Sequence, residues 1–312
     1  MEEGNQSVVL GFIFLGLTND KRMQVPLFVL FLLIYIVTLV GNVGIITLIR
    51  ITPNLQNPMY FLILSLSFVD ICGSSNIMPT ILGNFILEKN VISFPGCAIQ
   101  MFMFLSTAGL EVLVLVAMAF DRYIAICNPL RYTTIMTNTS FIYFVTVAVL
   151  IAISNAALHT ISTFQLSFCG SNKISHFYCD LLTLLKISCS DTSTNMLIQF
   201  IASATFSIVP LIIILLSYTS IIFTICKIRS SDGRQKAFST CLSHISCVTL
   251  FYGSYIFVYF KPGSSSSSNQ DSVGSLFYTV VFPMFNPIIY SLRNQDVKNA
   301  LRRAVERCRV CK

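Results

Sequence analysis

Residues 97–128, CAIQMFMFLSTAGLEVLVLVAMAFDRYIAICN, decide the fold of this chain. Before Asp121 this stretch holds a single charged residue, Glu111, and it exceeds the roughly 20 apolar residues that a helix needs to cross a bilayer. Only 11% of the chain is charged and 54% is hydrophobic, so the charges are too few to cover a water-soluble protein of 312 residues. The sequence therefore predicts an all-α membrane protein, a seven-transmembrane helix bundle with spans at 25–50, 58–82, 97–128, 140–164, 195–227, 237–260 and 271–292.

The basic residues predict the orientation of this bundle. Of the 20 lysine and arginine residues, 14 fall on the side of the C-terminus, which the positive-inside rule assigns to the cytoplasm. Residues 1–24 are then an extracellular N-terminus, 165–194 a long extracellular loop and 293–312 a cytoplasmic tail. The net charge of +7 is a topology signal, and we expect no nucleic-acid partner. The expected location is the plasma membrane, which the chain crosses several times.

Cysteines and a sequon are consistent with this orientation. Four cysteines fall on the extracellular side, in an oxidising compartment, so we expect two disulfides among Cys97, Cys169, Cys179 and Cys189. Their spacing leaves three pairings open. Asn5-Gln6-Ser7 is a glycosylation sequon, and we expect Asn5 to be modified if it is exported.

The tail after the last span predicts a short amphipathic helix. Residues 293–309 are basic, with apolar residues three and four positions apart at Val297, Leu301, Ala304 and Val305. Such a helix lies on the anionic inner leaflet, so membrane lipid is an expected partner. Cys308 and Cys311 are either palmitoylated there or remain free thiols.

Two carboxyl groups are predicted near the middle of the membrane. At about 1.5 Å per residue, Asp70 and Glu111 lie roughly 18 and 21 Å along their helices, and no basic partner occurs at that depth in any span. Each is either protonated, or shares a cation such as sodium with water and polar neighbours, for which Asn42 and Asn286 are candidates. Ionisable groups at this depth are usually functional. The alternatives are a structural hydrogen-bond cluster and a polar centre that rearranges when the helices move.

Two further motifs lie toward the cytoplasmic side. Asp121-Arg122-Tyr123 closes the third span, where Arg122 is either a snorkelling basic residue or a switch. Asn286-Pro287 interrupts the last span, because proline removes a backbone hydrogen bond and kinks a helix. That kink is either a moving element or a packing feature.

Taken together, these motifs resemble those of the olfactory receptors, within the rhodopsin-like class A G-protein-coupled receptors. The matching segments run the length of the chain: Gly41-Asn42, 58–61 (PMYF), Leu66, Asp70, 118–127 (MAFDRYIAIC), Ser217-Tyr218, 236–244 (KAFSTCLSH) and 283–294 (PMFNPIIYSLRN). Phe120 stands where the family usually has tyrosine. The long loop resembles that of the tetrapod-type (class II) receptors.

The resemblance implies a function and roles for single residues. An odorant would bind in the outer half of the bundle, and a heterotrimeric stimulatory G protein would bind at the inner face and raise cyclic AMP. Cys97 would pair with Cys179, and Cys169 with Cys189. Asp70 and Glu111 would form a cation-and-water site. The implied switch comprises Asp121, Arg122, Tyr123, Tyr218, His244, Asn286, Pro287 and Tyr290; Tyr218 and Tyr290 would swing toward Arg122 as it leaves Asp121.

Helical spacing then predicts the lining of the odorant pocket, which should be apolar with one or two polar groups. We expect it to draw on Met101, Phe104, Leu105, Ala108, Gly109, Gln199, Ala202, Ser203, Phe206, Tyr252, Tyr255, Ile256, Tyr259, Leu276 and Thr279. Ser203, Tyr255 and Tyr259 are the expected hydrogen-bonding residues. No acidic residue is expected in this pocket, so the predicted ligand is neutral. A carboxylate, the alternative, would need a basic partner that the sequence does not supply at this depth.

Two other classes of protein remain as alternatives. A small transporter could use the midplane carboxylates as a relay, but transporters usually have repeated halves, and no repeat occurs here. A membrane enzyme lacks support because His159, His176 and His244 lie on different segments without metal-ligand spacing. We therefore expect a receptor without enzymatic activity and without a bound metal other than a sodium ion.

Overall fold

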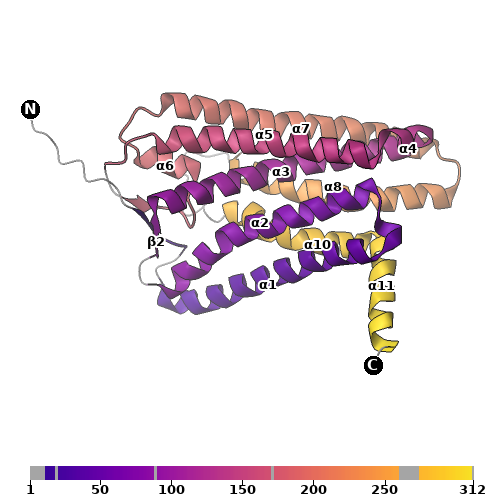
Figure 1. Cartoon of the computed structure of the whole chain (residues 1–312), viewed down its shortest axis with the longest axis horizontal. Coiled ribbons are helices and arrows are strands. Elements are labelled where there is room, and N and C mark those ends of the chain that lie inside the picture. The colour runs from indigo at the N-terminus through magenta and orange to yellow at the C-terminus, as the bar shows by residue number, and fades with distance from the viewer. Residues whose placement is uncertain (1–10, 18–19, 88–89, 170–171, 260–273, 311–312) are drawn as a thin grey trace, which may run out of the picture.

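The computed structural model describes residues 11–17, 20–87, 90–169, 172–259 and 274–310. Seven helical segments of this described part run side by side as one bundle (Figure 1). They are α1 (Lys21–Ile51), α2 (Pro58–Ile86), α3 (Phe94–Cys127), α5 (Asn138–Phe164), α7 (Ser193–Lys227), α8 (Ser231–Tyr259) and a last segment made of the π-helical η3 (Phe277–Val281) and α10 (Phe282–Arg293). Several helices begin before the predicted spans, because a helix can continue into the headgroup region.

Length and composition agree with a membrane location. Among the described helices, α1, α2, α3, α5 and α7 are each long and apolar enough to cross a bilayer, and the last segment joined to α11 (Gln295–Val310) is a sixth, bent candidate. The helix α8 is long as well, but its N-terminal half is rich in polar residues such as Arg234 and His244. Large apolar side chains, among them Val40, Phe200 and Phe223, cover the outside of the bundle. In a bilayer these side chains would contact lipid.

Local sequence signals fix where the helices begin. The side chains of Asn57, Ser93 and Thr137 each accept a hydrogen bond from a backbone N–H in the first turn of α2, α3 and α5. Such caps satisfy amide groups that have no partner inside the helix. The central helix is α3, which packs against α2, α5, α7 and α8. Residues on α3 therefore reach both ends of the bundle interior.

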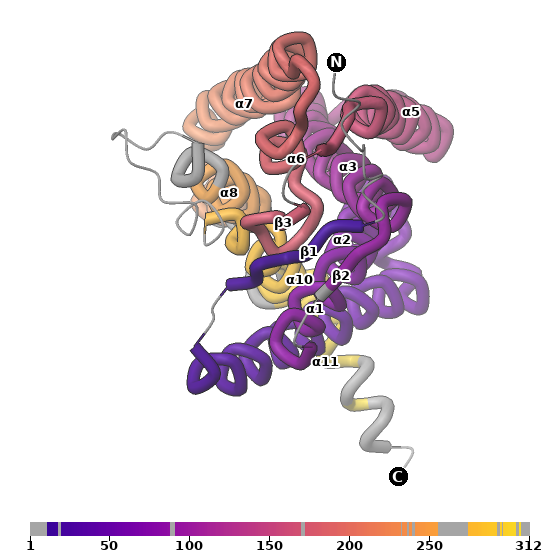
Figure 2. The backbone as a smooth tube through the Cα atoms, turned by 90° about the vertical axis from the view of Figure 1, so that its left-hand side faces the viewer, coloured from indigo at the N-terminus to yellow at the C-terminus, as the bar shows by residue number. Residues whose placement is uncertain are grey.

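A small sheet covers one end of the bundle, where α3 begins (Figure 2). Its order is β2-β1-β3: β1 (Gly11–Phe14) is antiparallel to β2 (Asn90–Ser93) and parallel to β3 (Lys173–Ile174). The short helix α6 (Leu181–Ile187) lies beside the sheet. The sequence did not predict the sheet or α6, because these strands are short and pair segments far apart in the chain.

Two disulfides hold the long segment between α5 and α7. Cys97 is bonded to Cys179 and Cys169 to Cys189, with Cα atoms 5.5 and 6.0 Å apart, which are the pairs that the resemblance implied. The residues before Cys179 are fully buried: Phe177 and Tyr178 fill the outer end of the bundle, and the ring of Tyr178 lies 4.8 Å from that of Phe104. The loop thus closes one end of the bundle interior.

Short elements also lie at the end of the bundle opposite the sheet. These are η1 (Pro53–Leu55), η2 (Pro129–Arg131), α4 (Tyr132–Ile135) and the tail helix α11, whose axis is bent by 80° from the last bundle segment. Val297 and Ala300 are buried and fasten α11 to the bundle, whereas Leu301 is exposed. Asn5, Cys311 and the side chains of Ala304, Val305 and Cys308 lie outside the described residues.

Candidate functional site

A cavity of about 160 Å³ lies in the outer half of the bundle, between α2, α3, α5, α7, α8 and the last segment. Many of the residues predicted from helical spacing line it together. They are Phe104, Leu105, Ala108, Gly109, Gln199, Ala202, Ser203, Phe206, Tyr252 and Thr279. The structure thus brings side chains from four separate spans around one space.

Other predicted pocket residues lie elsewhere. Met101 is buried in a cluster with Phe12 and Cys179 and does not line the cavity. Leu276 packs in a neighbouring cluster with Phe31 and Met78 and does not line the cavity either. The side chains of Tyr255, Ile256 and Tyr259 lie outside the described residues. Gly109 lines the cavity but has a second role. A Cβ there would meet the Ala152 Cβ at 3.3 Å, so this glycine lets α3 approach α5 closely.

The cavity also has polar lining residues that sequence reasoning missed. Asn155 and His159 of α5 line it. The predicted lining drew on other spans only, so it included no residue of α5. Glu111 lines it as well, so the expectation that no acidic residue faces the pocket is wrong. Glu111 lies near the middle of α3, and only the packing of the helices shows that the cavity extends down to it.

A polar core lies below the cavity. The amide of Asn286 donates to both carboxylate oxygens of Asp70, at 3.2 and 2.9 Å. All three side chains of Asp70, Glu111 and Asn286 are buried. Among the described residues the Asn286 Oδ1 atom has no hydrogen-bond partner. The core is therefore rich in oxygen acceptors and holds no basic side chain.

Asn42 belongs to this region but does not contact the carboxyl groups. Its side-chain amide donates to the backbone oxygens of Thr38 and Pro283, each at 3.0 Å. The Pro283 oxygen would normally accept from the backbone nitrogen of residue 287, but Pro287 has no N–H. The Asn42 amide nitrogen replaces that missing helix hydrogen bond and stabilises the kink, while its Oδ1 atom has no hydrogen-bond partner among the described residues.

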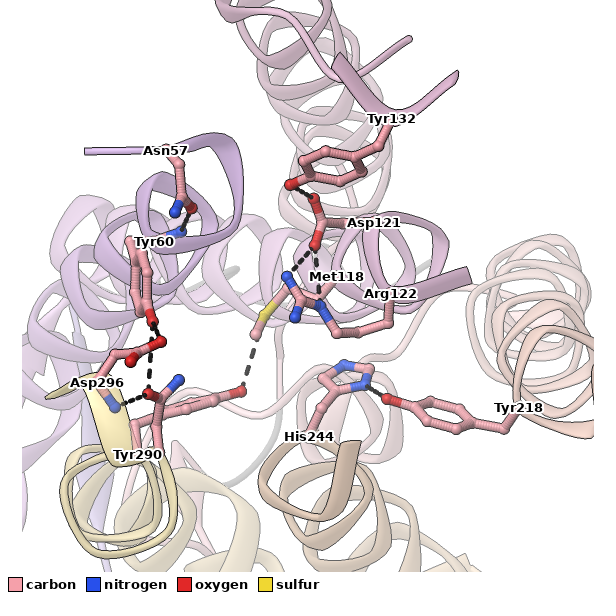
Figure 3. Close-up of polar contacts among 11 residues, drawn as sticks. Asn57, Tyr60, Met118, Asp121, Arg122, Tyr132, Tyr218, His244, Tyr290 and Asp296 are labelled. Atoms are coloured by element: carbon pink, nitrogen blue, oxygen red, sulfur yellow. Dashed lines mark hydrogen bonds and ion pairs between the residues drawn. The ribbon is translucent and has the colours of Figure 1, made fainter. Parts of the chain in front are cut away.

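Near the end of α3 that lies away from the sheet, the Asp121 carboxylate has two hydrogen-bond partners (Figure 3). One carboxylate oxygen accepts from the neighbouring Arg122 guanidinium, which is the only ion pair among the described residues. The other accepts from the hydroxyl of Tyr132 in α4 at 2.9 Å. Burial, and then the Asp121 carboxylate, raise the pKa of Tyr132 above its ordinary value. Asp121 thus holds the Arg122 side chain in an ion pair and also bonds to Tyr132. The sequence analysis did not single out Tyr132.

The two tyrosines of the implied switch point to other partners. The Tyr218 hydroxyl and the His244 Nδ1 atom share a hydrogen bond of 2.6 Å that links α7 to α8. The Tyr290 hydroxyl lies 3.8 Å from the Met118 sulfur. Neither tyrosine contacts Arg122 through a hydrogen bond among the described residues. These contacts link α7 to α8 and the last segment to α3.

A second polar cluster ties the tail helix to the bundle (Figure 3). The Tyr60 hydroxyl donates to Asp296 at 3.0 Å, and Asn294 accepts from the backbone N–H groups of Asp296 and Val297. Asn294 therefore caps α11, and Tyr60 of α2 fixes the position of its first turn. Residue spacing could not indicate this contact, because Tyr60 and Asp296 are more than 200 residues apart in the sequence.

Comparison with known proteins bears on the family. The olfactory receptor family model matches residues 31–307. Human olfactory receptor 5G3 is 48% identical over 307 residues, covering 98% of each chain. Human olfactory receptor 8U8 is 51% identical over 295 residues, covering 94% of this chain and 92% of its own. Mouse olfactory receptor 5G29 is 48% identical over 307 residues, again covering 98% of each chain.

A solved structure supports the fold. Squid rhodopsin superimposes with a TM-score of 0.73 at 18% sequence identity, over 94% of this chain and 88% of that chain. This confirms the predicted seven-helix architecture. Because the family model covers residues 31–307 and the relatives match from end to end, this chain belongs to the olfactory receptor family.

Proposed function

We propose that this receptor binds a small, neutral, volatile molecule in the outer cavity and activates a stimulatory G protein, which raises cyclic AMP. One observation carries the proposal: α3 lines the cavity with Phe104 and Leu105 and presents Arg122 at the opposite end. Movement at the cavity can therefore reach the switch through a single rigid element. Membership of a receptor family sets aside the enzyme and transporter interpretations.

The proposed mechanism is a shift between two arrangements. The resting arrangement is held by the contacts of Arg122 with Asp121 and of Tyr218 with His244. A ligand favours the active arrangement only as far as it binds that arrangement better. Closing the cavity around a ligand would displace Tyr252, turn α8 and pull His244 away from Tyr218. Arg122 would then leave Asp121 and receive the G protein.

The polar core fits a sodium ion in the resting arrangement. Hard cations prefer oxygen ligands, and Asp70, Glu111 and the Asn286 Oδ1 atom offer them. We propose that such an ion stabilises the resting receptor. Its loss on activation would let the last segment move.

The proposed setting is the plasma membrane, with the cavity outside and Arg122 inside. The sheet and the disulfides at the cavity end suit an oxidising exterior. At the other end α11 would lie on the inner leaflet, where Arg302 and Arg303 are exposed. Glycosylation of Asn5 is part of the same proposal.

The test is the Arg122→Ala variant in cells that carry a cyclic AMP reporter. We expect normal surface expression and no response to an odorant that activates the wild-type receptor. Arg50→Ala, an exposed arginine at the cytoplasmic end of α1, is the matched control and should keep its response. A normal cyclic AMP response from Arg122→Ala would contradict the proposal. A panel in which primary amines are the best agonists would contradict the neutral ligand, and would point to Glu111.

A further inference from the structure

His159 is buried against the cavity without a partner. Its side chain is only 2% exposed, and it lines the cavity from the α5 side. Among the described residues nothing hydrogen-bonds to its imidazole nitrogens; Ser162 bonds only to its backbone oxygen. Buried polar groups are nearly always hydrogen-bonded, so an imidazole in this position indicates that a partner comes from outside the chain.

Three other hydroxyl groups along the cavity, those of Thr107, Thr279 and Ser203, already take part in hydrogen bonds within the chain. Thr107 donates to the oxygens of Met103 and Phe104, and Thr279 donates to the oxygen of Ser275. On α7, the Ser203 oxygen accepts from Gln199 at 2.9 Å. These hydroxyl groups already have hydrogen-bond partners within the chain, whereas the His159 imidazole has none among the described residues.

Asn155 lies beside His159 on the same wall. It is one helical turn away, lines the same cavity and has no hydrogen bond to its side chain among the described residues. A neutral imidazole has one N–H donor and an amide has two. The two side chains can therefore donate to a single oxygen atom.

Glu111 lies at a different depth. Ala152 of α5 packs on Gly109, and His159 is seven residues further toward the extracellular end, about 10 Å at a rise of 1.5 Å per residue. Glu111 is two residues deeper than Gly109 in α3. A small ligand whose polar group reaches His159 therefore does not bring that group to the carboxyl group, and a charged group would lack an opposite charge there.

We propose that His159, with Asn155, receives the oxygen of a neutral ligand such as an alcohol, aldehyde, ketone or ester. The hydrocarbon part lies against Phe104, Leu105 and Phe206, which line the rest of the cavity. This inference rests on the proposed function, because it names the ligand class of the same cavity. His159 is then the residue that determines specificity for an oxygen group.

The test compares oxygenated odorants with hydrocarbons of the same skeleton. Wild-type receptor and His159→Phe are assayed for cyclic AMP with alcohols, aldehydes, ketones and esters of six to eight carbons, each paired with its parent alkane. Phenylalanine keeps the ring but removes both nitrogens. His159→Gln retains a donor and an acceptor, and Thr163→Val controls for packing, because Thr163 is buried one turn further along α5 but does not line the cavity. Surface labelling confirms expression of each variant.

We expect His159→Phe to raise the half-maximal concentration of the best oxygenated agonist at least tenfold, as the loss of a buried hydrogen bond predicts. His159→Gln should recover most of that potency, Thr163→Val should keep it, and weak responses to alkanes should not change. Unchanged potency in His159→Phe, or an equal loss for alkanes, would overturn this inference alone. A wild-type receptor that answers none of the panel would instead overturn the proposed function.

Discussion

The side-chain amide of Asn42 donates a hydrogen bond to the Pro283 backbone oxygen at 3.0 Å, where Pro287 cannot supply one. The two partners are 241 residues apart, on the first and last spans. Membrane helices tolerate an internal proline when a neighbouring helix satisfies the freed carbonyl. The Gly41-Asn42 and Asn286-Pro287 motifs are thus two halves of one contact.

Replacing Asn42 with leucine should destabilise the receptor. The variant keeps the size of the side chain but leaves the Pro283 oxygen buried without its donor, which costs about 1–3 kcal/mol. We expect a lower melting temperature of the purified protein in lipid nanodiscs. Thr47→Val on the exposed face of α1 is the control, since Thr47 bonds only to its own helix. Equal melting temperatures for wild type and Asn42→Leu would contradict the role of this bond.

Gly41 and Gly44 provide a matched pair on α1. A Cβ at Gly41 would lie 2.9 Å from the Pro287 Cγ, whereas at Gly44 it would meet nothing within 4 Å. Gly41→Ala should therefore push α1 away from the kink, and such overpacking lowers the free energy of unfolding by about 1–3 kcal/mol. Surface expression and the melting temperature should both fall. Gly44→Ala should be neutral or slightly stabilising, because alanine favours helix. Flow cytometry and thermal denaturation measure both, and equal effects of the two variants would refute the close approach.

The two disulfides should differ in how much they stabilise the fold. Cys97 and Cys179 are separated by 82 residues and hold the buried Phe177-Tyr178 segment, whereas Cys169 and Cys189 are separated by 20. Loop-closure entropy alone makes the longer link more stabilising by about 1 kcal/mol. We expect Cys97→Ser to abolish surface expression and Cys169→Ser to reduce it, with the exposed free Cys226→Ser as the control. A greater loss in Cys169→Ser would show that the short loop matters more.

Tyr132→Phe should raise signalling without ligand. The change leaves one buried oxygen of Asp121 without its donor, so the resting arrangement loses about 1 kcal/mol and the active population rises about fivefold. Basal cyclic AMP measures this, with the exposed Tyr143→Phe as the control.

The same contact predicts how signalling depends on pH. Since the pKa of Tyr132 is raised, its hydroxyl keeps its proton and its bond at every pH below the ordinary tyrosine value of about 10. The difference in basal signalling between wild type and Tyr132→Phe should thus be the same at pH 6 and pH 8. A difference that vanished at either pH would contradict a neutral hydroxyl donor.

The sequence determined the spans because lipid leaves few alternatives: backbone groups in the hydrocarbon core must be bonded within a helix. Long apolar stretches therefore predicted the bundle, and motif order predicted the family. Helical spacing also brought Phe104, Ser203 and Thr279 to one cavity, since residues three and four apart share a helix face.

Only the tertiary structure decided which faces meet. The apolar sequence of α5 does not indicate that Asn155 and His159 face the cavity, because their position depends on Gly109 letting α3 approach Ala152. Nor does local sequence indicate that Tyr132 bonds to Asp121, or that residues 11–14 form a strand with two distant segments. Periodicity fixes a residue's place on its own helix, whereas its partners depend on how separate helices pack. The seven spans were thus determined by the sequence alone, and the polar wall of the cavity by packing.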